Sequence, residues 1–486
     1  MKRSMIMKLM TCSLALVMAF GSVAGCAAKK KDPSDIEVRV KERSNDEVKE
    51  TEPVIVIETD STTATETEPS VTTVSNENVI NIYASTQEVV DMCDYYLSTH
   101  PDIGYTFDYT LTESYVYDDV LSSALSSYTF DNYPDIYMVD VSHSMKYIDG
   151  SLSQYAASYS DLFGHDIHKE LEEAEIAPYT YELATRDSDG EIVGLTYQST
   201  AGVMIYSSSI ALEVFGTDDP EEISELVGGG SGSWDMYWEC AEQVSDKGYA
   251  MVSSPFDIYK PMYSNAEGWC VDGKPAVSEE RLGYLDIAKM IKDNDYSNFT
   301  TQWTEAWYAD MDGQGERKVF SFFGPAWLIN YTLSVNANNS KGDWKVTDSP
   351  EDFIWGATWL MASQRGLQGS EEKKQVIADL INWATLDTSE EGYQYLRAIG
   401  AFGVQDAVPS SVVLRNVSAC PEVLGYQDMF PYIADANDNA YGMIVTSYTD
   451  ECESILIYDA MQYAEGEMTR DDVLEDLESN IPYFNE

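Results

Sequence analysis

Residues 79–111 read VINIYASTQEVVDMCDYYLSTHPDIGYTFDYTL, and this stretch decides the fold class. Residues 79–84 form a short apolar run of the kind found in buried strands. Apolar residues then recur at helical spacing between Val89 and Leu97. From residue 103 to residue 109, aromatic or aliphatic residues alternate with polar residues or glycine, as in a strand with one buried face. The stretch therefore predicts a strand, a helix and a second strand in succession.

The same alternation continues downstream. A second helical pattern follows Ser114, and residues 136–141 form a third apolar run. Strands that alternate with helices predict right-handed crossovers and a mainly parallel sheet. Ligands of such open sheets bind beyond the carboxyl ends of the strands. We therefore expect Ser85, residues 111–114 and Asp140 along one rim of this sheet.

Further patterns extend over the rest of the chain. Strands are predicted around residues 192–206 (in two pieces), 319–323 and 353–361. Helices are predicted around residues 234–244, 279–293, 325–333, 371–386, 389–399 and 452–464, and after Thr469. No repeat at a fixed period is visible, and this number of elements fits two α/β lobes better than one.

Acidic residues dominate the charge of the chain. It has 84 Asp and Glu against 29 Lys and Arg, which gives a formal net charge of −55. A surface this negative repels nucleic-acid phosphates, so most nucleic-acid binders are excluded. Hydrophobic residues make up 44% and aromatic residues 12% of the 486 residues, so most of the chain can form a buried core.

The N-terminus has the features of a secretory signal. Basic residues precede an uncharged apolar stretch that extends from Leu9 to Ala28. The sequence VAGC at residues 23–26 resembles the bacterial lipobox, so we expect residues 1–25 to be removed and Cys26 to become the lipidated first residue. The alternative is an uncleaved transmembrane anchor, because about 20 uncharged residues can span a bilayer.

Residues 26–76 are expected to form an acidic, disordered tether. They contain no aromatic residue after Cys26, and Thr and Glu dominate residues 51–73, so the segment cannot bury enough apolar surface to offset its ordering entropy. The protein is thus expected to be a monomer held by lipid on the extracytoplasmic face of the cell membrane. The surface of a cell with a single membrane is favoured, and a periplasm is the alternative.

The sequence lacks the common motifs of enzymes and metal sites. It has no HExxH, GxGxxG, Walker A or GxSxG pattern, and its widely spaced cysteines form neither a disulfide framework nor a zinc site. Asp435, Asn437 and Asn439 match the first ligand positions of a calcium loop, but Ala440 stands where that loop needs glycine. We therefore expect no cofactor, no metal and no enzymatic activity.

Tryptophans are concentrated in one part of the chain. All 10 fall between Trp234 and Trp383. Trp327 follows the predicted strand of FFGPAW and begins a helix, while Trp355 and Trp359 of WGATW are expected on one face of a strand. Flat apolar rings beside carboxylates and amides suit a pyranose, whose C–H faces are hydrophobic and whose hydroxyls need hydrogen-bond partners.

A buried tryptophan is also a common core residue. For Trp234, Trp238 and Trp383, which lie on apolar helix faces, a core position is favoured over a site. Trp269, and Trp303 with Trp307 one helical turn apart, fit either interpretation.

At these residues the chain resembles the family 1 extracellular solute-binding lipoproteins of ABC sugar importers, the maltose-binding-like group. The resemblance covers the chain from about Val79 to the C-terminus. It is carried by residues 190–206 (GEIVGLTYQSTAGVMIY), Ser233-Trp234, residues 319–330 (VFSFFGPAWLIN), residues 342–359 with their WGATW, and residues 466–469. Two departures concern Thr196, where the family commonly has proline, and Ala357, where it has a second glycine.

The resemblance implies a two-lobed α/β fold of the periplasmic-binding-protein type (type II), with a ligand cleft between lobes that close by hinge motion. One implied lobe comprises residues 77–198 and 350–400, and the other comprises residues 199–349 and 401–486. The chain would cross between them near Tyr197, Ser349 and Ile399.

The resemblance also implies roles for individual residues. Trp327 occupies the position of a sugar-stacking aromatic, the WGATW strand borders the cleft, and the first lobe offers polar contacts. The full predicted ligand-binding set is Ser85, Glu113, Asp140, Tyr197, Trp269, Trp303, Trp307, Trp327, Trp355 and Trp359.

These features predict a lipid-anchored receptor that captures a carbohydrate, preferably an oligosaccharide, and delivers it to the permease subunits of an ABC importer. Two alternatives remain at this point. One is a surface adhesin or a receptor for a non-sugar solute such as a peptide. The other is a secreted glycan-degrading enzyme, for which surface exposure and tryptophans are also expected.

Overall fold

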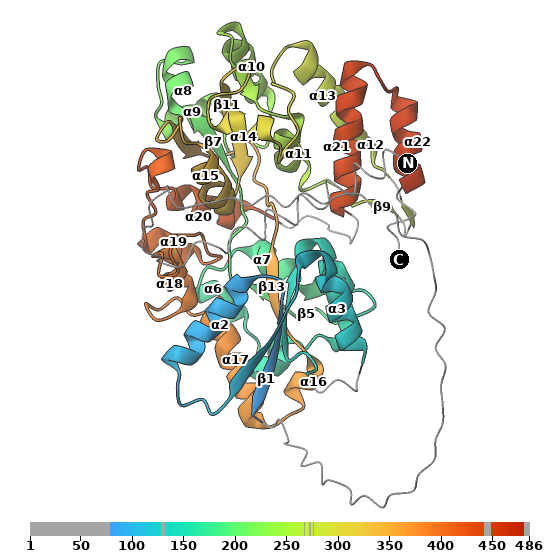
Figure 1. Ribbon diagram of the computed structural model, residues 1–486, viewed down its shortest axis with the longest axis vertical. Coiled ribbons are helices and arrows are strands. Elements are labelled where there is room, and N and C mark those ends of the chain that lie inside the picture. The colour runs from blue at the N-terminus through green and yellow to red at the C-terminus, as the bar shows by residue number, and fades with distance from the viewer. Residues whose placement is uncertain are drawn as a thin grey trace, which may run out of the picture. The chain divides into compact units, whose positions relative to one another are not determined.

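The computed structural model describes residues 78–127, 132–266, 268–271, 274–275, 277–441 and 449–480. Figure 1 shows the order of the helices and strands in these ranges. The predicted signal peptide, Cys26 and the predicted tether lie outside the described residues. Within the described ranges, no helix has both the length and the apolar character needed to cross a membrane.

The first sheet has five strands in the order β2–β1–β3–β13–β6. They are β1 (Val79–Ala84), β2 (Thr106–Leu111), β3 (Ile136–Asp140), β6 (Leu195–Thr196) and β13 (Thr358–Ala362). β1 pairs in parallel with β2 and with β3, as the alternation of strands and helices predicts. β13 runs antiparallel to β3 and to β6, so the sheet is mixed, and the prediction of a mainly parallel sheet is wrong.

Helices and short turns of the N-terminal half, together with three later helices, accompany this sheet. They are α2 (Gln87–Thr99), α3 (Ser114–Ser126), η1 (Val141–His143), α4 (Ser144–Ile148), η2 (Ser153–Tyr155), α5 (Tyr159–Phe163), α6 (His168–Glu173), α7 (Pro178–Glu182), α16 (Gln364–Leu367), α17 (Glu371–Thr385) and α18 (Tyr393–Ala398). α2 packs on β1 and β2, and α17 packs on α2 and α5. A two-stranded ladder of β4 (Thr185–Arg186) and β5 (Glu191–Ile192) lies beside α5.

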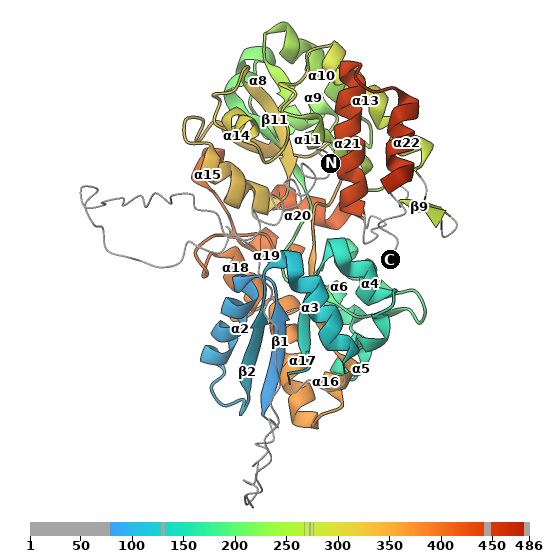
Figure 2. The ribbon, with the colours of Figure 1, turned by 45° about the vertical axis from the view of Figure 1, so that its right-hand side comes forward.

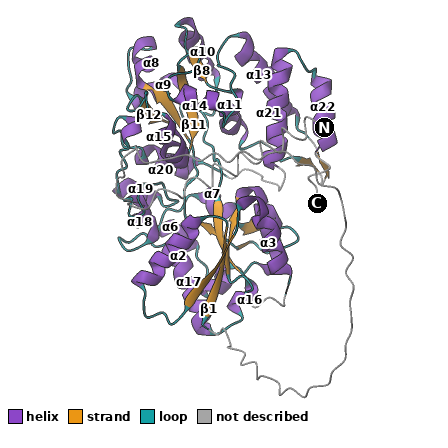
Figure 3. Cartoon of the chain, in the orientation of Figure 1, coloured by secondary structure: helices purple, strands orange, loops and turns teal. Residues whose placement is uncertain are grey.

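The second sheet has four strands in the order β12–β7–β11–β8. They are β7 (Val203–Ser207), β8 (Ala250–Val252), β11 (Val319–Gly324) and β12 (Trp344–Thr347). β7 runs antiparallel to β11 and β12, while β11 pairs in parallel with β8. In Figure 3 the strands of the two sheets form two separate groups, each accompanied by helices. The fold therefore contains two α/β lobes, each built on its own sheet.

The helices that accompany the second sheet come from the middle and the end of the chain. They are α8 (Ser208–Val214), α9 (Pro220–Val227), α10 (Asp235–Asp246), α11 (Pro255–Tyr263), α12 (Glu279–Leu282), α13 (Tyr284–Asp293), α14 (Glu305–Met311), the π-helix η3 (Leu328–Leu333), α15 (Ser334–Asn336), α19 (Ser411–Asn416), η4 (Glu422–Leu424) and α20 (Phe430–Asn439). α8 and α20 pack on β7, α9 on β12, and α10 on β8. A small ladder of β9 (Cys270–Val271) and β10 (Lys274–Pro275) follows α11.

The C-terminal helix α21 (Thr449–Glu465) packs on α13, and α22 (Arg470–Asn480) packs on α21. Residues of these three helices form a hydrophobic cluster with residues of α11 and α12. Figure 2 shows α21 and α22 as neighbouring helices, with α13 close to α21. A buried ion network holds α21 in place. Glu453 of α21 is 2% exposed, and its carboxylate lies 2.6 Å from the Lys260 ammonium and 3.3 Å from the Arg281 guanidinium.

Three segments of chain join the two sheets. Residues 197–202 lead from β6 of the first sheet to β7 of the second, and residues 348–357 lead from β12 back to β13. These two segments pair with each other through the antiparallel bridge of Ala201 and Ile354. Residues 399–410 follow α18, which packs on α17, and precede α19, which packs on α20.

Two predicted elements differ from the structure. The strand predicted at 353–361 begins only at Thr358, because residues 353–356 are occupied in pairing with the other connection between the sheets. Trp355 therefore precedes the strand and does not share a strand face with Trp359. The helix predicted at 279–293 is divided at Gly283 into α12 and α13.

Candidate functional site

Three half-buried indoles meet beside the paired connections. The ring centroids of Trp327 and Trp355 are 5.0 Å apart, those of Trp303 and Trp355 are 5.9 Å apart, and those of Trp303 and Trp327 are 6.3 Å apart. Trp303 and Trp327 are nearly parallel, at an interplanar angle of 20°, and Trp355 is tilted by 69° to Trp327. We call Trp303, Trp327 and Trp355 the indole cluster.

Each indole of the cluster is placed by a different local feature. Trp327 follows Gly324-Pro325 at the end of β11 and directly precedes η3. The backbone amide of Trp355 donates to the carbonyl oxygen of Thr200 at 2.9 Å, which fixes this residue to the neighbouring connection. Trp303 has a φ of +64°, a left-handed conformation that costs a non-glycine residue free energy, and it lies just before α14.

The packing around Gly356 supports this arrangement. Gly356 has a φ of +94°, and its carbonyl oxygen accepts a hydrogen bond from the Thr200 hydroxyl at 2.8 Å. A β-carbon at this position would lie 4.0 Å from the indole nitrogen of Trp327. The backbone conformation here suits glycine, which has no side chain to strain it.

The cluster has the chemistry of a stacking platform. All three residues are partly exposed and also pack against the largest hydrophobic core cluster, which contains residues of both sheets. Trp355 contacts a second cluster as well, on the second sheet. A rigid apolar ring face that remains partly in contact with water gains free energy when an apolar ligand face covers it.

Three other tryptophans of the predicted ligand-binding set are core residues instead. Trp269, Trp307 and Trp359 each have 0% exposure, so they offer no ring surface to a ligand in this structure. The Trp359 nitrogen donates to the Thr180 carbonyl at 2.6 Å, and Trp269 lies beneath the Arg281 guanidinium. Burial of these rings stabilises the lobes, and a sequence pattern alone does not distinguish it from a site.

Trp307 connects the indole cluster to a buried carboxylate. Its ring centroid is 5.0 Å from that of Trp303, and its nitrogen donates to Asp257 at 2.9 Å. Burial raises the pKa of Asp257 to about 7, although hydrogen bonds from Gln302, Trp307 and the Ser254 amide favour the charged form. Burial likewise raises the pKa of the neighbouring Asp310 to about 6.

Tyr197 is also buried, at 1% exposure. Its hydroxyl donates to Glu88 at 3.4 Å, and its ring lies 5.8 Å from the Arg397 guanidinium carbon. Burial raises the pKa of this phenol well above its usual range. Tyr197 therefore belongs to the interior of the first connection and is not part of a surface for ligand contact.

The predicted polar rim residues lie at the ends of three neighbouring strands. Ser85 follows β1, Glu113 lies two residues after β2, and Asp140 ends β3. Ser85 and Asp140 are partly buried, and Glu113 is exposed. The Asp140 carboxylate accepts from the Ser142 hydroxyl at 2.7 Å, and burial raises the pKa of Asp140 above its usual value. This rim fits the rule that the carboxyl ends of parallel strands share one edge.

Sequence reasoning missed a buried ion network around Arg397. The Arg397 guanidinium pairs with Glu88 and, at 2.7 Å, with Asp406, and the side chains of Arg397 and Asp406 are 6% and 4% exposed. Asp406 also accepts from the Tyr331 hydroxyl at 3.1 Å. The available signal was Arg397 itself, a cation on the apolar face of a helix in a chain with only 29 Lys and Arg.

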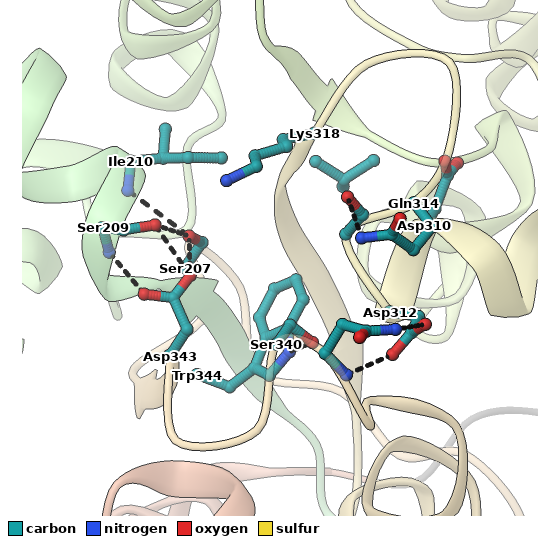
Figure 4. A pocket seen from close by; sticks show the side chains of 13 residues that line it. Ser207, Ser209, Ile210, Asp310, Asp312, Gln314, Lys318, Ser340, Asp343 and Trp344 are labelled. Atoms are coloured by element: carbon teal, nitrogen blue, oxygen red, sulfur yellow. Dashed lines mark hydrogen bonds between the residues drawn. The ribbon is translucent and has the colours of Figure 1, made fainter.

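A polar cavity of about 280 Å³ lies at one end of the second sheet (Figure 4). Asp343 in its wall accepts hydrogen bonds from the hydroxyls of Ser207 and Ser209 at 2.7 and 2.8 Å. Trp344 in the same wall is only 2% exposed. Because its carboxylates are satisfied by neighbouring side chains and its indole face is covered, this cavity lacks the features of a stacking site.

The residues of the partial calcium-loop pattern do not form a metal site in this structure, and two neighbouring histidines are paired with carboxylates. Asp435, Asn437 and Asn439 lie on helix α20 and not on a loop, and Asn437 is buried, where it accepts from the Ser199 hydroxyl at 2.6 Å. His165 and His168 are exposed and pair with Glu170 and Asp166. Within the described ranges there is no group of three or more His, Cys, Asp or Glu side chains suited to a metal ion.

Comparisons with known proteins place this geometry in a known fold. Neither a family model nor a curated protein matches the amino-acid sequence. Among solved structures, one described as an extracellular solute-binding protein of family 1 matches with a TM-score of 0.67 and 16% identity, over 84% of this chain and 100% of that chain. The chain has the fold of the family 1 extracellular solute-binding proteins.

Two further solved structures share this fold. The sugar-binding protein MalE from Xanthomonas citri matches with a TM-score of 0.59 and 12% identity, over 84% of this chain and 97% of that chain. The other is the galacto-N-biose-/lacto-N-biose I-binding protein of an ABC transporter from Bifidobacterium longum, in complex with lacto-N-biose. It matches with a TM-score of 0.56 and 12% identity, over 84% of this chain and 96% of that chain. These matches confirm the predicted two-lobed, periplasmic-binding-protein-like α/β fold.

Proposed function

We propose that this solute-binding-protein fold captures a carbohydrate, preferably an oligosaccharide, and that the indole cluster stacks on it. The observation that carries the proposal is the convergence of Trp303, Trp327 and Trp355 at the paired connections between the two sheets. Support also comes from solved structures of the same fold. One is described as a lacto-N-biose I-binding protein of an ABC transporter, and two others are described as a sugar-binding protein and a cyclic maltosyl-maltose binding protein.

Stacking on the indole cluster can supply part of the free energy of binding. Each indole face that covers a pyranose removes on the order of 80 Å² of apolar surface from water, or about 2 kcal/mol at about 25 cal/mol/Å². Three such contacts supply roughly 6 kcal/mol, whereas a micromolar ligand needs about 8 kcal/mol net of association costs. Hydrogen bonds to sugar hydroxyls must supply the remainder and the selectivity.

In this proposal the polar contacts come from the first lobe, and Ser85, Glu113 and Asp140 are the residues assigned to them. A hydroxyl and carboxylates are acceptors that suit sugar hydroxyls. We assign residues 77–198 and 350–400 to the first lobe, and residues 199–349 and 401–486 to the second. The ligand would lie in a cleft between the lobes and favour the closed arrangement by its additional contacts there.

The proposal extends to delivery. The captured carbohydrate would pass to the permease subunits of an ABC importer, with lipid on Cys26 and the following tether holding the receptor at the extracytoplasmic face of the membrane. The support for this part is the VAGC sequence at residues 23–26 and the ABC-transporter origin of a structural neighbour. The chain would act by binding and release, without catalysis.

The test is a titration of neutral oligosaccharides against the intrinsic tryptophan fluorescence of the full chain. Wild type is expected to bind at least one member of the panel, and Trp327→Ala and Trp355→Ala are each expected to weaken that binding by about tenfold or more, because each removes one stacked face. Trp238→Ala is the matched control. Trp238 is also a half-buried indole, but it lies on α10 and stacks on Tyr296, away from the cluster.

Two outcomes would contradict the proposal. Full affinity in both cluster variants would show that the ligand binds elsewhere. A fluorescence response to peptides alone would show that the substrate is not a carbohydrate.

A further inference from the structure

A buried ion network joins α2, α18 and the chain that follows α18. The Arg397 guanidinium of α18 pairs with the Glu88 carboxylate of α2 and with the Asp406 carboxylate, and it also donates to the Tyr393 hydroxyl at 3.3 Å. Arg397 lies just before the third connection between the sheets, residues 399–410, and Asp406 lies within it. The network therefore fixes the middle of this connection to α18 and to α2.

The same carboxylate reaches the helix that begins directly after Trp327. Asp406 accepts from the Tyr331 hydroxyl at 3.1 Å and from the side-chain amide of Asn330 at 3.1 Å, and both residues lie on η3. Asn330 also donates to the carbonyl oxygen of Gln405 at 2.9 Å. Because Trp327 is the residue that precedes η3, the position of its ring depends on where this helix is held.

Asp406 is also connected to the first connection. Its carboxylate accepts from the Ala407 amide at 2.9 Å, and the Ala407 carbonyl accepts from the Ser199 amide at 3.1 Å. Residues 197–202 in turn pair with residues 348–357, which carry Trp355. The third connection is thus bonded to the first, the first is bonded to the second, and η3 is bonded to the third.

We propose that Arg397 and Asp406 are positioning residues that hold η3, and with it Trp327, at the stacking distance from Trp303 and Trp355. This inference rests on the proposed carbohydrate-binding function. A buried ion pair contributes little net stability compared with apolar packing, but it favours one geometry because each charged group must keep its partners. The network acts through Trp327 and makes no contact with the ligand itself.

The mildest test removes a single hydroxyl. Tyr331→Phe deletes the hydrogen bond to Asp406 and leaves the aromatic ring, so the chain is expected to fold. Tyr109→Phe is the matched control, because it deletes a tyrosine hydrogen bond to Asp94 (2.6 Å) at β2. Arg397→Lys is the stronger variant, since lysine keeps the charge but cannot reach both carboxylates with a planar fork.

The primary measurement does not depend on a ligand. The full chain is labelled with 5-fluorotryptophan, and the fluorine NMR resonance of Trp327 is assigned by its loss in Trp327→Phe. Tyr331→Phe and Arg397→Lys are expected to shift or broaden the Trp327 resonance, and Tyr109→Phe is expected to leave it unchanged. A Trp327 resonance at the wild-type position in both network variants would overturn the proposal.

The second measurement is the affinity for the neutral oligosaccharide that wild type binds most tightly in the panel. Tyr331→Phe is expected to weaken binding about three- to tenfold, and Tyr109→Phe is expected to leave it unchanged. If wild type binds no member of the panel while Tyr331→Phe still moves the Trp327 resonance, the proposed function fails and the positioning role stands. If wild type binds the oligosaccharide and both network variants bind it with the same affinity, that result would contradict the positioning role.

Discussion

The indole nitrogen of Trp327 donates a hydrogen bond to the backbone carbonyl of Trp355 at 3.2 Å. The bond uses the polar edge of the Trp327 ring and leaves its faces for apolar contact. It also joins a residue at the end of β11 to a residue on the connection between β12 and β13. The indole cluster is therefore organised before a ligand binds, which reduces the entropy lost on binding.

Gly356 next to Trp355 is expected to be sensitive to substitution. At its φ of +94°, Gly356→Ala should lower the free energy of unfolding by about 1–2 kcal/mol and displace the backbone that carries Trp355, which weakens oligosaccharide binding. Denaturant unfolding and fluorescence titration measure the two effects. Gly216→Ala is the control, because Gly216 has a similar φ of +81° and nothing within 4 Å of an added β-carbon. Loss of affinity in both variants would contradict a local role for Gly356.

The buried carboxylate of Asp257 is expected to make stability depend on pH. Burial raises its pKa to about 7, above the unfolded value of about 3.9. The folded state therefore binds this proton more tightly than the unfolded state, and this carboxylate makes the protein less stable as the pH rises from about 4 to about 7.

The comparison with Asp257→Asn isolates that effect. The altered hydrogen bonds of Asp257→Asn should lower its free energy of unfolding by the same amount at every pH. As the pH rises from 5 to 8, the free energy of unfolding of Asp257→Asn should increase relative to that of wild type, because only wild type carries the titrating carboxylate. Asp286→Asn, at an exposed position on α13, serves as the control. A difference between Asp257→Asn and wild type that stays constant over this pH range would refute the assignment.

Glu453 is expected to be essential for anchoring α21. Glu453→Gln removes the carboxylate that the buried Arg281 and Lys260 share, so the free energy of unfolding should fall by about 3–5 kcal/mol. Glu465→Gln breaks the exposed pair with Lys292, in which both side chains are about 40% exposed, and should cost at most about 1 kcal/mol. Chemical denaturation of both variants measures these losses in the free energy of unfolding. An equal loss in the two variants would disprove the ranking.

Acidic saccharides are expected to bind less tightly than neutral ones of the same length. The chain carries a net charge of −55, the predicted rim contains Glu113 and Asp140, and Arg397 is already paired with two carboxylates. A uronic-acid analogue should therefore lose affinity relative to the neutral sugar, and the loss should decrease as salt screens the repulsion. Calorimetric titrations at low and high salt test this, and preferential binding of the acidic analogue would contradict it.

Local patterns predicted the first lobe well. The run at residues 79–84, the helix that follows it and the parallel strands β2 and β3 all occur near their predicted positions, because strand and helix periodicity is a local property of the sequence. The partners of β13 were not predictable in this way. It joins β3, more than two hundred residues earlier in the sequence, and only tertiary packing determines that pairing.

The site was predictable in part. The sequence drew attention to Trp327 because it follows Gly324-Pro325 at a strand end, and to Trp355 because it directly precedes Gly356. It could not separate them from Trp359, which is fully buried, since an indole that fills a core and an indole that lines a surface have the same local sequence signal. The Arg397 network was missed because Glu88, Arg397 and Asp406 are brought together only by the folded chain.

The most direct test of the central claim is a fluorine NMR titration of the 5-fluorotryptophan-labelled chain with the tightest-binding neutral oligosaccharide. The account predicts that the largest shifts belong to Trp303, Trp327 and Trp355, and that the buried Trp269, Trp307 and Trp359 shift least. Saturable binding that leaves all three resonances of the indole cluster unmoved would contradict it.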